Sequence, residues 1–306
     1  MGKEKILILG SRGLLGTSFR KYIENNNINS IDFIYGVRTE DDIESDKDIV
    51  FDILNVDKYD DILSKVSVVI NCVAYTDVDK AETDELNFKL NADAVGKLAN
   101  KCKEYNIHLI HFSTDFVFSG FESLSYFKEI DLKYAGNKYG KAKSAGERLI
   151  EESGCKSIIF RVSWLYSEHK SNFITKFYDK LIQNQDVNAI NDIVSGLTYA
   201  DDLVGDILDI ILSGYLPNFQ DVIFHYRNDG DVSVYDIAMK IKEYCKSNAN
   251  VIPVSQENFQ FKAKRPSYSS LVTTRFEKAF KKNIPCWDDS LIKCLDRYQN
   301  LVLEKN

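Results

Sequence analysis

Short apolar runs alternate with helical patterns through the first half of the chain, and this alternation strongly constrains the fold. Strand-like runs occur at residues 5–9, 31–37, 48–51, 66–74, 107–113 and 156–164, and helical periodicity fills most of the intervals between them. Alternation of this kind predicts βαβ units around a parallel sheet that is buried on both faces. Right-handed crossovers then favour a doubly wound α/β sheet of Rossmann type.

After about residue 165 the alternation becomes irregular. Helical patterns at residues 172–184, 200–214 and 234–248 surround one strand-like run at 222–227, and all four prolines lie in this half. We therefore predict an NAD(P)-binding Rossmann domain over residues 1–165. Residues 166–306 would form a smaller mixed α/β lobe, mainly for substrate, with some segments returning to the Rossmann core. Because open α/β sheets bind ligands at the carboxyl ends of their strands, this lobe should cover that edge.

The composition argues against several classes of protein. A net charge of −7 over 306 residues disfavours a broad surface for nucleic acid. The sequence has no apolar run long enough for a transmembrane helix, and its first residues lack the pattern of a signal peptide. Scattered cysteines without a CxxC pair indicate free thiols rather than a disulfide framework or a zinc site. We therefore expect a cytoplasmic protein with no nucleic-acid partner, no membrane partner and no metal.

The segment GSRGLLG lies between the first strand-like run and the first helical pattern, where a dinucleotide fingerprint must lie. Gly10, Gly13 and Gly16 would let the backbone turn tightly and approach a pyrophosphate, and the following helix N-terminus offers free N–H groups. The alternative is that these glycines only form a turn. Their context favours a cofactor site that includes Ser11 and Arg12.

The end of the second strand-like run bears on the choice of cofactor. NAD-selective sites usually place a carboxylate there to accept from the ribose 2′-OH, but this run ends in Val37 and Arg38. Arg12 and Arg38 instead offer cations to a 2′-phosphate, so we favour NADPH. Asp41 and Asp42 follow shortly afterwards and leave NADH possible.

Two further polar residues are candidates for cofactor contacts. Asp52 follows the third strand-like run and could accept from the adenine amino group, or could cap the segment after it. Asn91 begins the helical pattern at residues 91–106, where it could contact the cofactor or act as an N-cap.

Hydroxyl and carboxyl side chains follow the strand-like run at residues 107–113. Thr114 and Asp115 lie at its carboxyl end, which is the ligand edge of the predicted sheet. Tyr139 and Lys143 follow in the next helical pattern, one turn apart and therefore on one face. A Tyr-x-x-x-Lys spacing alone could equally mark two side chains on the outside of a helix. We expect Tyr139 and Lys143 to converge with Thr114 beside a nicotinamide, and this convergence favours a catalytic trio.

Carbonyl reduction explains these residue types. A phenol with a pKa of ~10 is a poor acid or base at neutral pH. We expect the ammonium of Lys143 and an oxidised nicotinamide to lower the pKa of Tyr139. Tyr139 would then give a proton to the carbonyl oxygen as hydride reaches the carbon, while Thr114 donates a hydrogen bond to that oxygen. Lys143 would also hold the nicotinamide ribose.

Several longer motifs carry a family resemblance: GSRGLLG, INCVAYTDVDKAE, LNADAVGKLA, HFSTDFVFSG, YGKAKSAGE, IFRVSWLY and RPSYSSL. Together they resemble the extended branch of the short-chain dehydrogenase/reductases, and within it the dTDP-4-dehydrorhamnose reductase family, from residue 5 to about residue 275. The resemblance implies a Rossmann fold, NAD(P)H as cofactor, and reduction of the C4 ketone of a nucleotide-linked 6-deoxysugar.

The resemblance also implies roles for particular positions. The pyrophosphate turn would be Gly13, Leu14 and Leu15; the adenine contact Asp52 and Ile53; the cofactor lining Ala74, Tyr75 and Thr76. The catalytic trio would be Thr114, Tyr139 and Lys143, and the substrate pocket would include Asp115 and Trp164.

Two departures from the family pattern concern the substrate. Phe116 replaces a tyrosine after the Thr-Asp pair, at a position expected to touch the sugar, and Tyr268 replaces an asparagine in the late RPxNSxL motif. Arg265 in that motif is a candidate for the diphosphate or the base, or is an ordinary surface arginine. Phe116 cannot take a proton, which disfavours a dehydratase, but it leaves room for another ketosugar such as a heptose.

One non-enzymatic alternative uses the same fold. A regulatory subunit of methionine adenosyltransferase binds nucleotide without catalysis, and such a module is free to lose the tyrosine or the lysine. The presence of Thr114, Tyr139 and Lys143 together favours the enzyme. A homodimer is possible. We carry over no metal, because the metal-binding glutamates of some family members have no match here.

Overall fold

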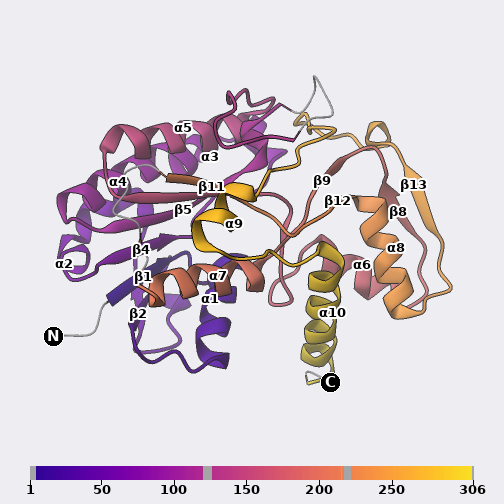
Figure 1. Cartoon of the computed structure of the whole chain (residues 1–306), viewed down its shortest axis with the longest axis horizontal. Coiled ribbons are helices and arrows are strands. Elements are labelled where there is room, and N and C mark those ends of the chain that lie inside the picture. The colour runs from indigo at the N-terminus through magenta and orange to yellow at the C-terminus, as the bar shows by residue number, and fades with distance from the viewer. Residues whose placement is uncertain (1–4, 120–125, 215, 217–221, 305–306) are drawn as a thin grey trace.

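The computed structural model describes residues 5–119, 126–214, 216 and 222–304, and its largest feature is a seven-stranded parallel sheet (Figure 1). The strand order is β11-β6-β5-β4-β1-β2-β3, and each neighbouring pair is parallel. The strands are β1 Lys5–Leu9, β2 Asp32–Val37, β3 Asp48–Val50, β4 Val68–Asn71, β5 His108–Thr114, β6 Ser157–Val162 and β11 Val222–Tyr226. This order, which runs outward on both sides of β1 and β4, gives the predicted doubly wound sheet.

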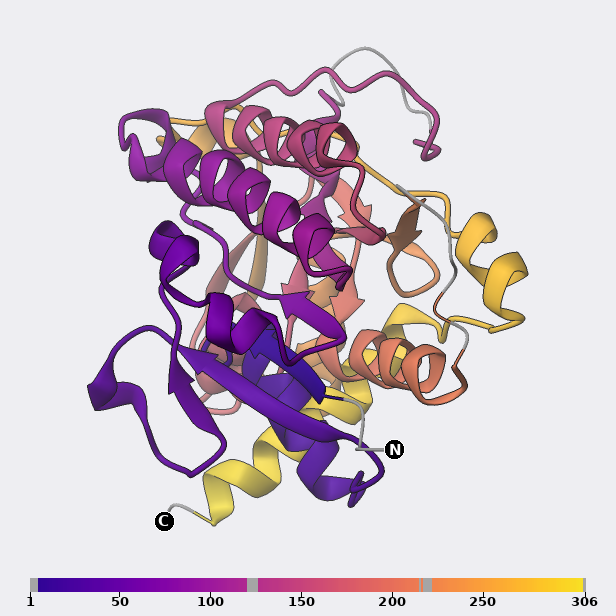
Figure 2. The same cartoon turned by 90° about the vertical axis from the view of Figure 1, so that its left-hand side faces the viewer.

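Helices cover both faces of this sheet, which explains why its strands are largely apolar (Figure 2). In β1, the side chains of Ile6 and Ile8 pack into one layer with α1 (Leu14–Asn25) and α7 (Ala200–Leu212). The alternate side chains, Leu7 and Leu9, pack into the other layer with α4 (Ala94–Glu104) and α5 (Lys138–Ser153). All four of these side chains are at most 1% exposed, so the sheet lies at the centre of the core.

The remaining elements on the Rossmann side are short. They are α2 (Asp60–Leu63), α3 (Leu86–Phe88), α9 (Thr274–Phe280), and the 3₁₀ segments η1 (Glu40–Asp42), η2 (Ile53–Lys58), η3 (Lys80–Glu82) and η5 (Asp115–Val117). A single π-turn, η4 (Lys89–Asp93), joins α3 to α4. This turn excludes one of the two alternatives for Asn91: the residue lies inside a continuous helical segment that starts before it, so it is not an N-cap.

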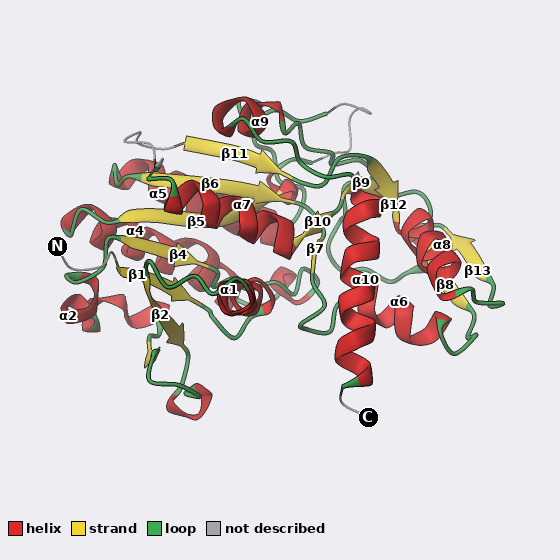
Figure 3. Cartoon of the chain, turned by 60° about the horizontal axis from the view of Figure 1, so that its bottom comes forward, coloured by secondary structure: helices red, strands yellow, loops and turns green. Residues whose placement is uncertain are grey.

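A second group of elements packs around its own apolar cluster beyond the carboxyl ends of the strands (Figure 3). Its helices are α6 (Phe173–Leu181), α8 (Val234–Cys245) and α10 (Trp287–Leu303). Its strands pair as β7 (Leu165–Tyr166) with β10 (Thr198–Tyr199), β8 (Val187–Ile190) with β13 (Val251–Val254), and β9 (Val194–Gly196) with β12 (Asp231–Ser233); η6 (Gln256–Asn258) follows β13.

The chain passes between these two groups more than once. After α6 and β8 it returns through α7 and β11, which belong to the large sheet, and it leaves again through β12 and α8. The exact domain boundary at residue 165 stays a prediction. Among the described residues, no helix is both long and apolar enough to cross a membrane.

Candidate active site

A cleft of about 280 Å³ lies at the carboxyl ends of β1, β2 and β4. It is lined by Gly10, Arg12, Gly13, Gly36, Val37, Arg38, Asp42, Phe51, Asp52, Ile53, Leu54, Cys72, Val73, Ala74, Leu86 and Leu90. Many of the residues predicted to bind a dinucleotide therefore lie on one surface.

The glycine turn at the base of this cleft leaves no room for side chains. Gly10 has φ +69°, a conformation that favours glycine, and the N–H of Gly13 donates to its carbonyl at 2.9 Å. A Cβ at Gly16 would stand 2.3 Å from that same carbonyl oxygen. The glycines thus bring β1 and the start of α1 close together and leave a bare backbone cradle, which fits a pyrophosphate.

The two predicted 2′-phosphate cations differ in their surroundings. Arg12 lies against the cleft, but its guanidinium pairs with Glu44 at 2.5 Å and Asp48 at 3.1 Å and donates to the carbonyl of Asp42. These acidic partners already neutralise Arg12, which weakens it as a phosphate ligand. Arg38 is exposed and lines the cleft at the end of β2, so it is the better placed of the two.

Asp52 and Ile53 both line the cleft at the start of η2. The Asp52 carboxylate also accepts from the N–H of Leu54 at 3.1 Å and from the side chain of Asn55 at 2.6 Å, so it caps the segment after β3. The capping role and the adenine contact are compatible, because a carboxylate has four lone-pair sites.

Asn91 shapes the stretch after β4 from within the helix. Its Oδ1 accepts from the N–H of Tyr75 at 3.0 Å, and its Nδ2 donates to the carbonyl of Tyr75 at 2.9 Å. This two-way bond fixes the backbone between Ala74, which lines the cleft, and Thr76, which is exposed. Asn91 thus positions the predicted lining, while its direct contact with a cofactor stays a prediction.

Thr114 and Tyr139 come together where α5 crosses the end of β5. A Cβ on Gly140 would stand 2.0 Å from the carbonyl oxygen of Phe116, so only glycine permits this close approach. The ring of Tyr139 meets Phe116 edge to face at 6.0 Å, and a side-chain hydrogen bond joins its phenol to Thr114. The start of α5 is fixed by Asn137, whose side chain accepts from the N–H of Gly140 at 2.8 Å.

The pKa of Tyr139 differs from the expectation. Burial and the Asp115 carboxylate raise the pKa of Tyr139, and the side-chain hydrogen bond between Tyr139 and Thr114 only partly offsets them. The ammonium of Lys143 does not lower it, because that side chain turns toward β5 instead. The protein groups alone therefore keep the phenol protonated.

Lys143 is buried, and its Nζ donates to the carbonyl of Phe112 at 2.6 Å. Nζ also lies 3.3 Å from Nε2 of His111. Burial lowers the pKa of Lys143 to about 8, although Glu147, one turn further along α5, opposes this shift.

A buried ion pair supports the helix behind the trio. Both Nε and Nη2 of Arg161 on β6 donate to the Glu147 carboxylate, at 3.0 and 2.8 Å, and both side chains are 1% exposed. Lys133 adds a second cation at 3.1 Å. These cations hold the pKa of Glu147 below its ordinary value despite burial.

A second cavity, of about 320 Å³, lies between the end of β5 and the group of elements around α6 and α8. Its walls are mostly aromatic and aliphatic: Phe116, Trp164, Phe173, Phe177, Asn188, Ile190, Ile193, Val234, Phe259, Phe261, Arg265, Pro266 and Ser269. Three predicted substrate residues, Phe116, Trp164 and Arg265, thus share one cavity. Trp164 has φ +39°, a strained conformation for a bulky residue.

Arg265 is held on two sides. Its guanidinium makes a two-pronged ion pair with Asp79, at 3.1 and 2.7 Å, and lies 3.5 Å over the ring of Phe261. Asp79 also accepts from the backbone N–H groups of Lys262 and Ala263. Arg265 is therefore a fixed part of the cavity wall, and its contact with a diphosphate or a base stays a prediction.

Comparison with known proteins identifies the family. A sequence profile of the RmlD substrate binding domain matches residues 4–300. The chain belongs to this family. The dTDP-4-dehydrorhamnose reductase of Aggregatibacter actinomycetemcomitans is 33% identical over 94% of this chain and 97% of its own length. The enzyme of Escherichia coli K12 with the same name is 30% identical over 75% of this chain and 79% of its own length.

Solved structures of the family share the fold. A dTDP-4-dehydrorhamnose reductase from Bacillus anthracis, in complex with NADP, has a TM-score of 0.85 and 27% identity, covering 97% of this chain and all of that one. One from Clostridium acetobutylicum has a TM-score of 0.84 and 30% identity over 96% of this chain and 99% of its own. The predicted family and the predicted Rossmann-type fold are therefore confirmed.

Asp115 is buried and is not among the residues that line the aromatic cavity. Its side chain accepts from the hydroxyl groups of Thr114, Ser195 and Ser269, and the residue is 2% exposed. Burial raises the pKa of Asp115 to about 6 against the opposing effect of these hydrogen bonds. Asp115 therefore joins the end of β5 to β9 and to the RPSYSSL segment; a direct contact with substrate stays a prediction.

Sequence reasoning missed the residues that act through others. Asp79 lies within the VDKAE stretch, but its partner Arg265 is 186 positions away. Glu147 lies one turn after Lys143, a spacing that could have marked it as part of the same face. Asn71 and Ser269, both buried, carry no local signal that distinguishes them from ordinary core polar residues.

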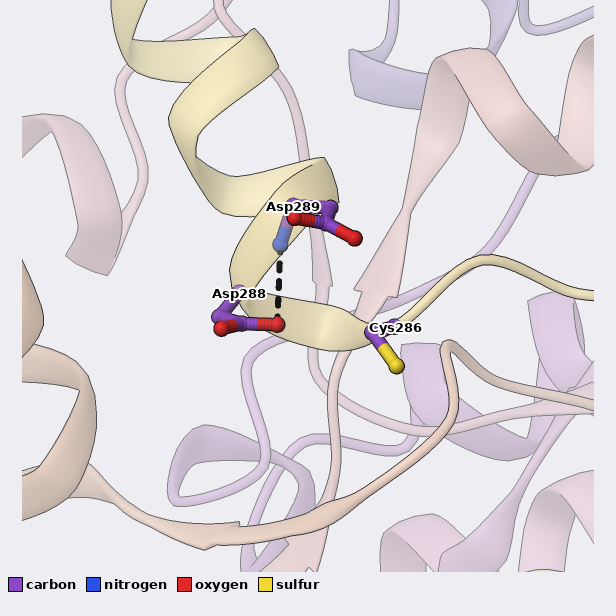
Figure 4. A group of neighbouring side chains, drawn as sticks. All are labelled: Cys286, Asp288 and Asp289. Carbon is purple, nitrogen blue, oxygen red and sulfur yellow. Dashed lines mark hydrogen bonds between the residues drawn. The ribbon is translucent and has the colours of Figure 1, made fainter.

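A separate group of possible metal ligands lies at the start of α10 (Figure 4). Cys286, Asp288 and Asp289 place one ligand atom each within 4.8 Å of one another, and the N–H of Asp289 donates to Asp288. Acidic side chains in the first turn of a helix are stabilised by its dipole, which explains this cluster without an ion.

Proposed function

We propose that this protein is an NADPH-dependent reductase of the C4 ketone of a nucleotide-linked 4-keto-6-deoxysugar, with dTDP-4-dehydrorhamnose the first substrate to test. The observation that carries the proposal is the position of Tyr139 and Thr114. Thr114 ends β5, the strand beside β4, and the residues that follow β4 line the glycine cleft. Phe116, whose ring meets that of Tyr139, lines the aromatic cavity. The related proteins named above carry this activity in their names.

Bound NADPH would supply a hydride to the carbonyl carbon. The residues near it have separate tasks. Tyr139, kept protonated by burial and by Asp115, gives its proton to the carbonyl oxygen, and Thr114 donates a hydrogen bond as negative charge develops there. A raised pKa suits this direction of reaction, because the acid must be protonated before each turnover.

The cofactor would lie across the glycine turn, with its adenosine end toward β2. Gly10, Gly13 and Gly16 leave the backbone open to the pyrophosphate, and Asp52 with Ile53 would meet the adenine. Arg38 would pair with the 2′-phosphate, which is the contact that favours NADPH over NADH.

The nucleotide sugar would occupy the aromatic cavity. Phe173, Phe177 and Phe259 offer flat apolar faces to a base, and Asn188 offers an amide that can pair with its edge. Phe116 borders the cavity and meets the ring of Tyr139, so the sugar must lie on this side for its ketone to reach the phenol. We expect the protein in the cytoplasm, where its six free cysteines would stay reduced.

The test is NADPH oxidation, followed by absorbance, with 4-ketosugars linked to dTDP, UDP, GDP and CDP, and with NADH in parallel. We expect turnover with one nucleotide class and a loss of about 10²–10⁴-fold in kcat for Tyr139→Phe. Tyr134→Phe is the matched control, because Tyr134 is 72% exposed outside the site. Tight NADPH binding with no turnover on any substrate would favour a binding module or another ketosugar, such as a heptose.

A further inference from the structure

Two buried polar side chains, Asn71 and His111, lie beneath Lys143 and have no part in the proton transfer described above. Asn71 ends β4, and His111 lies opposite it in the parallel register of β4 with β5. Both are at most 1% exposed. Asn71 Nδ2 lies 3.2 Å from Nδ1 of His111, and His111 Nε2 lies 3.3 Å from Nζ of Lys143. The three side chains therefore form one buried line.

The direction of the hydrogen bonds in this line is set at its far end. The N–H of Val73 donates to Oδ1 of Asn71 at 3.1 Å, which turns Nδ2 of the same amide toward His111. An amide nitrogen can only donate, so Nδ1 of His111 must accept. A neutral imidazole then carries its single proton on Nε2. Burial is the main reason that the pKa of His111 lies well below its ordinary value, and it keeps the ring neutral whether or not Lys143 carries a charge.

This tautomer conflicts with an ammonium at Lys143. The Nε2–H group of His111 points at Nζ, and an ammonium has three donors and no acceptor. A neutral amine resolves the conflict, because it accepts from Nε2–H and still donates to the carbonyl of Phe112, 2.6 Å away. Protonation of the amine requires the imidazole proton to move to Nδ1, and Asn71 must then give up its bond with the ring or with Val73.

We propose that Asn71 and His111 are positioning residues that favour the neutral amine of Lys143 and couple its protonation to a change of His111 tautomer. The proposal concerns the catalytic lysine of the proposed reductase and rests on that function for its kinetic consequences. The coupling itself depends only on the geometry of β4, β5 and α5.

Other charged groups around Lys143 do not remove this coupling. Glu147 on the same helix favours the ammonium, but Arg161 on β6 and Lys133 already pair with that carboxylate. Asp115, after β5, acts on the phenol of Tyr139. Among the titratable side chains that the structure describes around Lys143, only the ring of His111 lies within hydrogen-bond distance of Nζ.

The decisive measurement is the tautomer of His111, read from long-range ¹H–¹⁵N correlation spectra of the imidazole nitrogens. The chain has only four histidines, and His111→Gln assigns the signal. We expect a neutral ring with Nε2 protonated at pH 9.5, and a shift of the proton to Nδ1 as pH falls through the pKa of Lys143. A ring protonated on Nδ1 at pH 9.5, or a charged imidazolium above pH 6, would overturn the proposal.

Variants of Asn71 separate this role from simple packing. In Asn71→Asp the new oxygen accepts from Nδ1–H, so we expect the Nδ1 tautomer at every pH. Asn71→Ser removes the restriction without adding charge, because a hydroxyl can donate or accept. In an active enzyme, the part of the pH–rate profile that follows Lys143, whose pKa is about 8, should move upward by about one pH unit in Asn71→Asp, and less in Asn71→Ser.

Two outcomes distinguish the two proposals. If His111 shows the predicted tautomers but no ketosugar is turned over, the coupling stands and the proposed reductase function is overturned. Turnover with an unmoved pH profile in both variants, after thermal melts have shown both to be folded, would overturn the coupling.

Discussion

The buried carboxylate of Asp115 should lower stability as pH rises, and the structure gives the size of this effect. Its pKa in the folded protein is about 6, against 3.8 in the unfolded chain, because burial outweighs the hydrogen bonds from Ser269, Thr114 and Ser195. Between these values the folded state holds a proton that the unfolded state has lost, so the free energy of unfolding falls with pH. A difference of roughly 2.2 pKa units corresponds to about 3 kcal/mol.

The substitution Asp115→Asn removes this titration while keeping a side chain of the same shape. The free energy of unfolding is measured with urea for both proteins at pH 4.5 and pH 7.5. The difference between the two proteins cancels the contributions of the other carboxylates, because both proteins contain them. Over this interval the wild type should lose about 2 kcal/mol more than the variant, because part of the transition lies below pH 4.5. An equal change in the two proteins would refute the reasoning, since it would mean that Asp115 is no harder to ionise in the fold than in the unfolded chain.

Three other substitutions test separate parts of the structure. Glu147→Gln leaves Arg161 buried without its carboxylate and should lower the free energy of unfolding by about 3–5 kcal/mol, measured by urea denaturation. Arg38→Ala should raise the Kd for NADPH about tenfold and leave that for NADH nearly unchanged, as measured by fluorescence titration; equal losses for both would point away from the 2′-phosphate. Asp79→Asn breaks the partly exposed pair with Arg265; we expect a KM for the nucleotide sugar several-fold higher, with NADPH affinity unchanged.

The sheet could be predicted from the sequence because its evidence is local. A strand buried on both faces must be largely apolar, and β1 has that pattern in the four residues from Ile6 to Leu9. The glycine turn is equally local, since Gly10, Gly13 and Gly16 act within one strand–helix junction. The confirmed fold follows from such short-range signals, repeated along the first half of the chain.

The electrostatics of the site could not be predicted in the same way, because they depend on partners distant in sequence. Arg12 looked available for a phosphate, yet Glu44 and Asp48 reach it from beyond η1. Asn91 looked like an N-cap because the π-turn before α4 has no clear sequence signature. The pKa of Tyr139 required the position of Asp115 and the direction of the Lys143 side chain, and neither follows from a Tyr-x-x-x-Lys spacing.

Asp115 also connects stability with chemistry. Its carboxylate is the second cause of the raised pKa of Tyr139, after burial, so removing its charge should make the phenolate easier to form. In Asp115→Asn the alkaline limb of the kcat profile should therefore move to lower pH, if the variant still turns over substrate. An unmoved limb would mean that Asp115 does not influence the phenol during catalysis. A reductase needs a protonated acid at each turnover, so a carboxylate that lowers stability can persist because it widens the pH range in which Tyr139 stays protonated.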